Sequence, residues 1–314
     1  MRFRSIHIII IAVFSMCLIL SPLSISMAAQ EIHFGTSTVG GIYYSIGVPI
    51  TQVLNKYMPE IHVTPEITNG STENIRLLDQ GKLELGLSVP YKTVDAMNGK
   101  PPFERKIPVR TVMRTIPVVN LFVVLANSDI KSHEALKGKR VNLGQPGGLD
   151  ENALGILEAY GLTKNDIKWS VIGVAQGVDA LKDGKMDAVI TTIPLINQLK
   201  ATHEIRILWP DEAHLDKMMA KVLGWGKWLM PPGNIKGVDK PVYVPDFGSQ
   251  LTCLENASPE LIYKITKNLM EHLGELQGMF AQYKDLTKEM AATSLGVPFH
   301  PGAAKYFKEA GLIK

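Results

Sequence analysis

One order of predicted elements occurs twice along this chain, with the two copies about a hundred residues apart. Each copy consists of a strand, a glycine-rich turn, a helix, a strand, a short helix and a strand. The elements of the first copy fall at residues 31–34, 35–41, 43–57, 61–68, 71–82 and 83–88. Those of the second copy fall at residues 139–143, 144–148, 150–162, 167–173, 175–182 and 183–191. The repeat predicts two lobes built on the same α/β plan.

In each lobe, this alternation predicts a mainly parallel sheet with flanking helices on both faces. Right-handed crossovers then place each glycine-rich turn at the carboxyl edge of its sheet, which is where open sheets bind ligands. We expect a ligand cleft between lobe I, at residues 29–121 and 206–314, and lobe II, at residues 122–205. The two helix N-termini at this cleft favour anionic groups such as carboxylates.

Residues 1–28 have the pattern of an export signal. A basic start is followed by an almost wholly apolar run at residues 8–20, and Ser26-Met27-Ala28 has the small-residue pattern of a cleavage site. An uncleaved membrane anchor is the alternative, but the apolar run is short for a span of about 30 Å. We therefore expect a cleaved signal peptide at residues 1–28 and a mature protein outside the cytoplasm.

The charge distribution argues against a nucleic-acid partner, and the cysteine content argues against a cysteine nucleophile. Removal of the signal, with Arg2 and Arg4, lowers the formal net charge from +3 by two, and the remaining basic residues are dispersed. Because nucleic-acid binding needs a basic stripe, we expect no nucleic-acid partner. The mature chain keeps a single cysteine, Cys253, inside an apolar run, which favours a buried packing role over a nucleophile.

The first glycine-rich turn, GTSTVGG at residues 35–41, does not have the spacing of a dinucleotide-binding or phosphate-binding loop. The chain also contains no G-x-S-x-G elbow and no H-E-x-x-H helix, since His133-Glu134 is followed by Lys137 where a zinc site needs histidine. These absences favour a binding protein over an enzyme. We expect no metal and no organic cofactor.

Several polar side chains of the first lobe fall at the predicted cleft. A hydroxyl of the turn can donate to a ligand carboxylate or cap the following helix, and three hydroxyls exceed what one cap needs. Tyr43 can wall the pocket with its hydroxyl facing in. Turn formation explains Asn69 as well as ligand contact does. The candidate ligand-binding residues of this lobe are Thr36, Ser37, Thr38, Tyr43, Asn69, Ser71 and Ser88.

The second lobe offers an equivalent rim. Gly148 precedes the second helix and presents backbone N–H groups there. Asp150 can cap that helix or contact the ligand. Thr191 and Thr192 end the strand that corresponds to the one ending at Ser88, so they are also candidate ligand-binding residues.

The chain resembles the TAXI family, which contains the solute-binding proteins of one branch of the TRAP transporters. The resemblance rests on GTSTVGGIYYSIG, ITNGSTENIRLLDQGKLELGLS, LKGKRVNLGQPGGLDENALGILEAYGL, ALKDGKMDAVIT, PELIYKITKNLMEHLGEL and VPFHPGAAKYFKEAGL, which follow one another in order. It implies a two-lobed periplasmic binding protein, acting as a monomer, that delivers a glutamate-like amino acid or another small organic anion to TRAP-type membrane transporter subunits. A ligand-sensing protein that acts with a membrane receptor is the alternative.

Three segments depart from the pattern of that family. Asp150 stands where members typically carry threonine, and Leu87-Ser88-Val89-Pro90 replaces an expected Val-Gln-x-Asp. WGKWLMPP, at residues 225–232, also differs from the usual segment. If Asp150 faces the cleft, its charge opposes a second ligand carboxylate, so a dicarboxylate such as glutamate is a poor fit.

Overall fold

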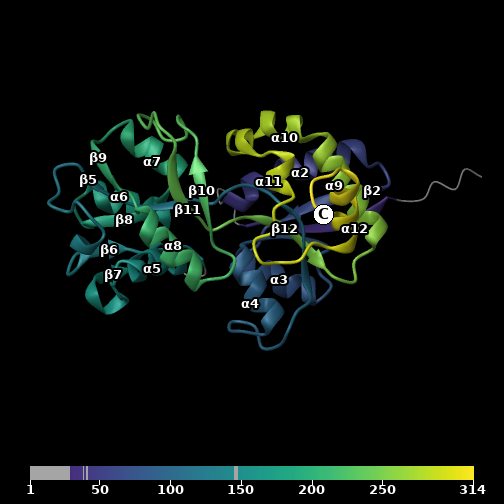
Figure 1. The fold of residues 1–314 in the computed structure, drawn as a ribbon, viewed down its shortest axis with the longest axis horizontal. Helices are drawn as coiled ribbons and strands as arrows, with labels where there is room; N and C mark the ends of the chain where they lie inside the picture. The colour runs from purple at the N-terminus through teal and green to yellow at the C-terminus, as the bar shows by residue number, and fades with distance from the viewer. Residues whose placement is uncertain (1–28, 38, 40–41, 145–147) are drawn as a thin grey trace, which may run out of the picture.

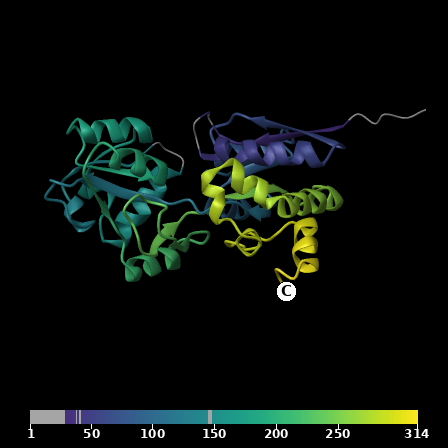
Figure 2. The ribbon, with the colours of Figure 1, turned by 90° about the horizontal axis from the view of Figure 1, so that it is seen from above.

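The computed structural model describes residues 29–37, 39, 42–144 and 148–314. This part of the chain forms two lobes that lie side by side, each built around a five-stranded sheet (Figures 1 and 2). No helix within it combines the length and the apolar character of a membrane span. The predicted signal peptide at residues 1–28 lies outside the described residues, so its prediction stays untested.

The sheet of the first lobe has the strand order β2-β1-β3-β12-β4. Its strands are β1 (Gln30–Gly35), β2 (Ile61–Glu66), β3 (Leu85–Ser88), β4 (Val109–Arg114) and β12 (Gln250–Leu254). The helices of this lobe are α2 (Ile42–Tyr57), α3 (Ser71–Asp79), α4 (Pro90–Asn98), α9 (Pro259–Glu271), α10 (Leu273–Met279), α11 (Lys288–Ala291) and α12 (Pro301–Glu309), with the 3-10 helix η3 (Ala281–Asp285). The apolar face of α2 packs into the core of this lobe, where Ile46, Ile50, Val53 and Leu54 are fully buried and Tyr57 is partly buried.

The sheet of the second lobe has the order β7-β6-β8-β5-β9. Its strands are β5 (Asn120–Leu125), β6 (Arg140–Asn142), β7 (Lys168–Ser170), β8 (Ala188–Thr192) and β9 (Ile205–Leu208). The helices are α5 (Leu149–Ala159), α6 (Val174–Lys182), α7 (Ile193–Lys200) and α8 (Glu212–Lys221), with η1 (Glu134–Leu136) and η2 (Lys164–Asp166). A separate antiparallel ribbon is formed by β10 (Gly226–Met230) and β11 (Val242–Asp246).

The two-lobed α/β architecture agrees with the sequence prediction, but the sheets are mixed rather than mainly parallel. β1 pairs in parallel with β2 and β3, whereas β12 pairs antiparallel with β3 and β4. In the second sheet, β6 pairs in parallel with β7 and β8, whereas β5 pairs antiparallel with β8 and β9. The antiparallel strands β5 and β12 directly follow the segments that cross between the lobes. The strand and helix repeat contains neither of them, so it could not predict their direction.

The packing of α8, β10 and β11 indicates where the second lobe ends. Leu215 and Met218 of α8 lie in the core beneath the second sheet, and Met230 of β10 and Val244 of β11 lie in the core on its other side. The boundaries predicted from the sequence place these four residues in lobe I. We propose that the second lobe instead runs from about residue 118 to residue 247, because these elements bury their apolar faces against its sheet.

Candidate ligand-binding site

Two segments, at residues 115–119 and 247–249, carry the chain between the lobes and lie against each other. Thr115 N donates to Ser249 O at 2.8 Å, and Phe247 N donates to Val118 O at 2.9 Å. The carboxylate of Asp246, which is fully buried, joins both segments. Its Oδ1 accepts from Val118 N at 2.9 Å and from Gly248 N at 2.8 Å, and its Oδ2 forms an ion pair with Arg114. These contacts hold the two crossing segments against each other at the boundary between the lobes.

The N-terminal turns of α4 and α5 meet across the lobe boundary. The Tyr91 hydroxyl donates to Gly148 O at 3.4 Å, and Lys92 Nζ lies 2.6 Å from Glu151 Oε1. Burial raises the pKa of Tyr91 well above its ordinary value, and the nearby charge of Glu151 raises it further. The hydroxyl of Tyr91 therefore stays protonated and able to donate.

The described hydroxyls of the first glycine-rich turn hold the turn itself. Thr36 is fully buried, and its Oγ1 donates to Glu66 O at 2.8 Å. Ser37 Oγ accepts from Tyr44 N at 3.1 Å, in the first turn of α2. This arrangement matches the capping interpretation of Ser37. A ligand role for Thr36 and Ser37 stays a prediction, and Thr38 lies outside the described residues.

Tyr43 and Ser71 lie together in the structure, with Tyr43 Oη 3.3 Å from Ser71 Oγ, and their ligand roles stay predictions. Ser71 Oγ also accepts from Val89 N at 3.0 Å, just before α4 begins. Burial raises the pKa of Tyr43 above its ordinary value, so this hydroxyl is also protonated. Tyr43 and Ser71 thus stand next to the segment that leads to the interlobe contact of Tyr91.

The side chains of Asn69 and Ser88 form hydrogen bonds with other residues of the first lobe. The Asn69 side chain donates to Glu73 Oε2 at 2.8 Å, which fits the turn-forming alternative. Ser88 is fully buried, and its Oγ lies 2.8 Å from Thr93 Oγ1 inside the lobe. Neither side chain joins Tyr43 and Ser71 through a direct hydrogen bond, and their ligand roles stay predictions.

In the second lobe, Asp150 Oδ1 accepts from Gly148 N at 3.3 Å. Asp150 is the second residue of α5, whose N-cap is Gly148, so its carboxylate bonds back to the N-cap amide and its charge favours this helix end. Thr191 is fully buried, and its Oγ1 has no hydrogen-bond partner. Thr192 is half-buried and directly precedes α7 without a side-chain capping bond. Of these residues, Thr191 has the clearest capacity for a further hydrogen bond.

Polar atoms without partners gather where the lobes meet. Within the described residues, seven buried side-chain atoms lack a hydrogen-bond partner, and only Thr51 Oγ1 belongs to the body of a lobe, in α2. The other six lie in the crossing segments or at the strand ends and helices beside them: Arg114 Nε, Thr115 Oγ1, Ser249 Oγ, Asn152 Oδ1, Thr191 Oγ1 and Trp225 Nε1. An unpaired buried polar group costs about 1–3 kcal/mol, so such a concentration marks a place where a ligand can satisfy several groups at once.

Sequence reasoning missed most of these residues. Asn152 and Trp225 were absent from the candidate set, and so was Tyr91. Trp225 lies in the segment that departs from the TAXI pattern, which was the available signal. Among the described residues, no group of three or more His, Cys, Asp or Glu side chains could hold a metal ion.

The two mixed sheets, their flanking helices and the paired crossing segments define the two-lobed fold of periplasmic solute-binding proteins. The chain belongs to the NMT1-like family, whose profile matches residues 34–311.

Solved structures with this fold share little sequence with the chain. The periplasmic aliphatic sulphonate binding protein SsuA from Escherichia coli is 17% identical, with a TM-score of 0.53, over 90% of this chain and 84% of SsuA. A binding protein component of an ABC phosphonate transporter from Pseudomonas aeruginosa is 13% identical, with a TM-score of 0.54, over 81% and 79% of the two chains. A Xanthomonas citri protein bound to ATP is 12% identical, with a TM-score of 0.55, over 90% and 97%. These likenesses show a shared fold.

Proposed function

We propose that this protein is an exported, periplasmic solute-binding protein that closes its two lobes on a small organic molecule without chemically changing it. The observation that carries the proposal is the set of six unpartnered buried polar atoms at the lobe boundary. Because they come from the second lobe, from the crossing segments and from the end of β4, a ligand that pairs with them stabilises the closed state over an open one.

The ligand we propose is a small organic anion or amino acid whose acid group lies toward the first lobe. The N-terminus of α2 favours an anionic group there. On the second lobe, Asp150 and Glu151 stand in the first turn of α5, and Glu151 already neutralises Lys92. Two like charges about 4 Å apart repel by roughly 4 kcal/mol at an effective dielectric near 20, so a second acid group is disfavoured on this side.

Substitution of Asp150 tests this orientation of the ligand. If its charge acts on the ligand, Asp150→Thr strengthens the binding of dicarboxylates such as glutamate and weakens the native ligand by about 1–3 kcal/mol. If Asp150 only caps α5, the variant loses about 0.5–2 kcal/mol of stability and binds the native ligand unchanged. Calorimetric titration and thermal melting of the same two proteins separate these results.

The membrane partner we propose is a TRAP-type transporter, supported by the resemblance to the TAXI family. An ABC transporter is the second candidate, because the Pseudomonas aeruginosa relative is a component of an ABC phosphonate transporter. A membrane receptor remains the alternative to transport. The neighbouring genes discriminate: a multi-spanning permease alone supports TRAP, a permease with an ATPase supports ABC, and a sensor kinase supports signalling.

Ligand binding is tested by a thermal-shift screen of amino acids and organic acids, read together with intrinsic fluorescence. A ligand at a hundred times its Kd stabilises the folded state by about 2.7 kcal/mol. The four tryptophans are Trp169, Trp209, Trp225 and Trp228. Trp225 lies at the lobe boundary, so Trp225→Phe should remove most of the fluorescence change. A screen with neither a shift nor a fluorescence change refutes the proposal, and consumption of a bound compound indicates an enzyme instead.

A further inference from the structure

One face of α5 points toward the lobe boundary. Gly148, Asn152 and Gly155 stand at positions i, i+4 and i+7, so they form a single stripe along the helix. At one end of the stripe, Gly148 O accepts from the Tyr91 hydroxyl. At the other end, the indole of Trp225 packs so closely on Gly155 that a β-carbon there would lie 1.9 Å from Trp225 Cη2. Asn152 therefore lies on the face of α5 that Tyr91 meets at Gly148 and that Trp225 meets at Gly155.

The rings of Tyr91, Trp225 and Phe247 form a continuous series of aromatic contacts. Tyr91 and Trp225 meet edge to face, with ring centroids 6.0 Å apart, and Trp225 meets Phe247 in the same way at 5.2 Å. Tyr91 belongs to the first lobe and Phe247 to a crossing segment. These contacts link the first lobe, a crossing segment and α5, so they depend on the relative position of the two lobes.

Asn152 and the Trp225 ring carry one unpartnered acceptor and one unpartnered donor. Asn152 is 3% exposed, and its Nδ2 donates to Asn120 Oδ1 at 2.9 Å, which leaves Asn152 Oδ1 as the atom without a partner. Trp225 Nε1 is also buried without a partner, and an indole nitrogen can only donate. A group that satisfies both atoms must itself donate one hydrogen bond and accept another.

The charges around this position disfavour an acid group. Glu151 and Asp150 both act on the Tyr91 hydroxyl and raise its pKa, after burial, which is the largest cause. Glu151 also holds Lys92, whose side chain is only 6% exposed. A carboxylate would be desolvated next to the helix turn that carries Asp150 and Glu151, of which only Glu151 is paired with Lys92, and it would bring no proton for Asn152 Oδ1.

We propose that Asn152 and Trp225 form a subsite for an uncharged polar group of the ligand, such as a primary carboxamide or a hydroxyl, which donates to Asn152 Oδ1 and accepts from Trp225 Nε1. This inference rests on the proposed solute-binding function. It adds that the ligand has one acidic end and one uncharged end that both donates and accepts hydrogen bonds. Trp225 and Asn152 then determine which of two solutes of similar shape the protein binds more tightly.

The experiment uses pairs of solutes that differ in this one group. Calorimetric titration of the full mature protein compares L-glutamine with L-glutamate, succinamate with succinate, and lactate with propionate. The wild-type protein should bind the first member of at least one pair about 5- to 30-fold more tightly, as expected for one or two hydrogen bonds. The Trp225→Phe variant keeps a ring against Gly155 but lacks the donor, so the preference should fall toward equal binding.

A matched control and a second variant separate a ligand contact from a packing role. Trp228→Phe changes a tryptophan of β10 whose nitrogen is not among the unpartnered buried atoms, and it should keep the wild-type preference. Without ligand, Trp225→Phe loses no hydrogen bond, so its apo Tm should stay within a few degrees of that of Trp228→Phe. Asn152→Leu, which removes the acceptor, should also lose the preference.

The outcomes distinguish this inference from the function on which it rests. If the wild-type protein binds the two members of every pair equally tightly, or if Trp225→Phe keeps the wild-type preference, the subsite assignment is wrong while solute binding stands. If none of the six compounds, and none of the compounds in the wider screen, binds the wild-type protein, the proposed function fails and the subsite with it.

Discussion

Replacing Asp246 with Asn changes one atom of the carboxylate that joins the two crossing segments, and it removes the charge. Both backbone donors, Val118 N and Gly248 N, bond to the same oxygen, Oδ1, whereas Arg114 pairs with Oδ2. An asparagine that keeps Oδ1 in place can still accept from both amides. Its Nδ2 then faces Arg114, so the substitution removes the ion pair and leaves the backbone bonds.

The expected cost follows from burial. Asp246 is 1% exposed and Arg114 is 8% exposed, so Asp246→Asn leaves a guanidinium buried without a compensating charge. Loss of one partner of a buried pair destabilises a protein by about 3–5 kcal/mol. Asp246→Ala should cost more, by about 1–3 kcal/mol for each amide left without an acceptor. The double variant Arg114→Met with Asp246→Asn should recover most of the loss, because an apolar replacement of a buried pair is often neutral.

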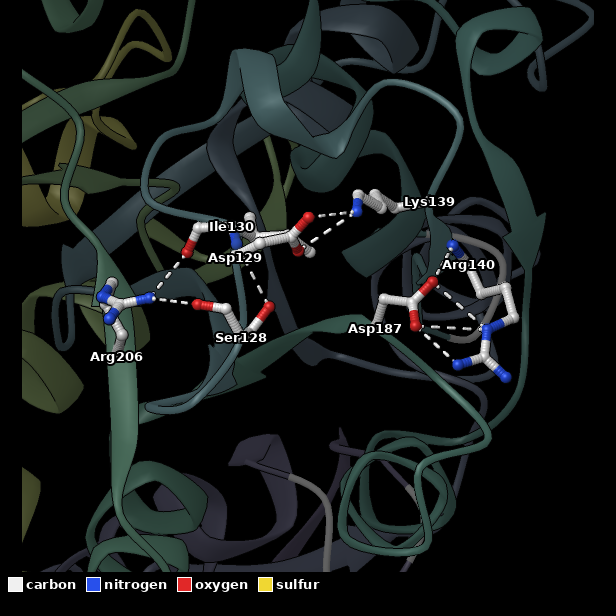
Figure 3. A network of polar contacts seen from close by, with 7 residues as sticks. All are labelled: Ser128, Asp129, Ile130, Lys139, Arg140, Asp187 and Arg206. Carbon is white, nitrogen blue, oxygen red and sulfur yellow. Dashed lines mark hydrogen bonds and ion pairs between the residues drawn. The ribbon is translucent and has the colours of Figure 1, made fainter.

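The control is an ion pair on the surface of the second lobe. Figure 3 shows Lys139 reaching Asp129, near the loop whose carbonyls accept from Arg206. The Asp129 side chain is 78% exposed, so Asp129→Asn should cost only about 0–1 kcal/mol. Urea unfolding of the four variants and the wild-type protein, followed by circular dichroism, gives the comparison. If Asp246→Asn costs no more than Asp129→Asn, the ion pair does not brace the crossing segments and the reasoning is refuted.

Three further predictions concern other buried groups. Burial lowers the pKa of His133 from 6.5 to about 4, so the unfolded chain binds this proton first and stability should fall by about 3 kcal/mol as the pH drops from 6.5 to 4. His133→Phe should flatten this slope in urea midpoints measured across that window, and an unchanged slope would assign it to other groups. Gly155→Ala should displace the Trp225 ring and cost about 1–3 kcal/mol by overpacking, whereas Gly274→Ala, with no atom near its β-carbon position, should stabilise the protein by about 0.5–1 kcal/mol. Equal melting temperatures for these two variants would contradict the packing. Burial raises the pKa of Cys253 to about 12, so a thiol reagent such as DTNB should react only after unfolding, and fast labelling of the native protein would show that the thiol is accessible.

Local sequence patterns were sufficient for the elements of the repeat. The strands β1, β2 and β3 and the helices α2, α5 and α6 fall where the periodicity predicted them. The reason is that each depends on its own apolar spacing and on nearby glycine turns. The same patterns could not place β10 and β11, because a ribbon outside the repeat joins a lobe only through the surface on which it packs.

For the candidate site, the sequence patterns predicted which strand ends and turns carry polar side chains, but not the hydrogen-bond partners of those side chains. Tyr43 was predicted from its place in the first turn of a helix and Ser71 from its place at the end of a strand, but only the structure shows that the two hydroxyls lie together. Ser88, by contrast, ends a strand as predicted, yet its hydroxyl bonds to Thr93 inside the lobe. Strand position determines the edge at which a residue lies, whereas its hydrogen-bond partners depend on the elements that later pack against it.

The sequence by itself therefore determined two lobes of α/β plan and the helix α5, whose start meets α4 across the boundary between the lobes. Only the tertiary structure decided that Trp225 packs on the face of α5 that carries Asn152, 73 positions earlier in the chain, and that both side chains have unpartnered polar atoms. It also decided that Asp246 joins both crossing segments. Periodicity is a property of neighbouring residues, but the burial of a polar atom and the choice of its partner are set by chain segments that meet only after folding.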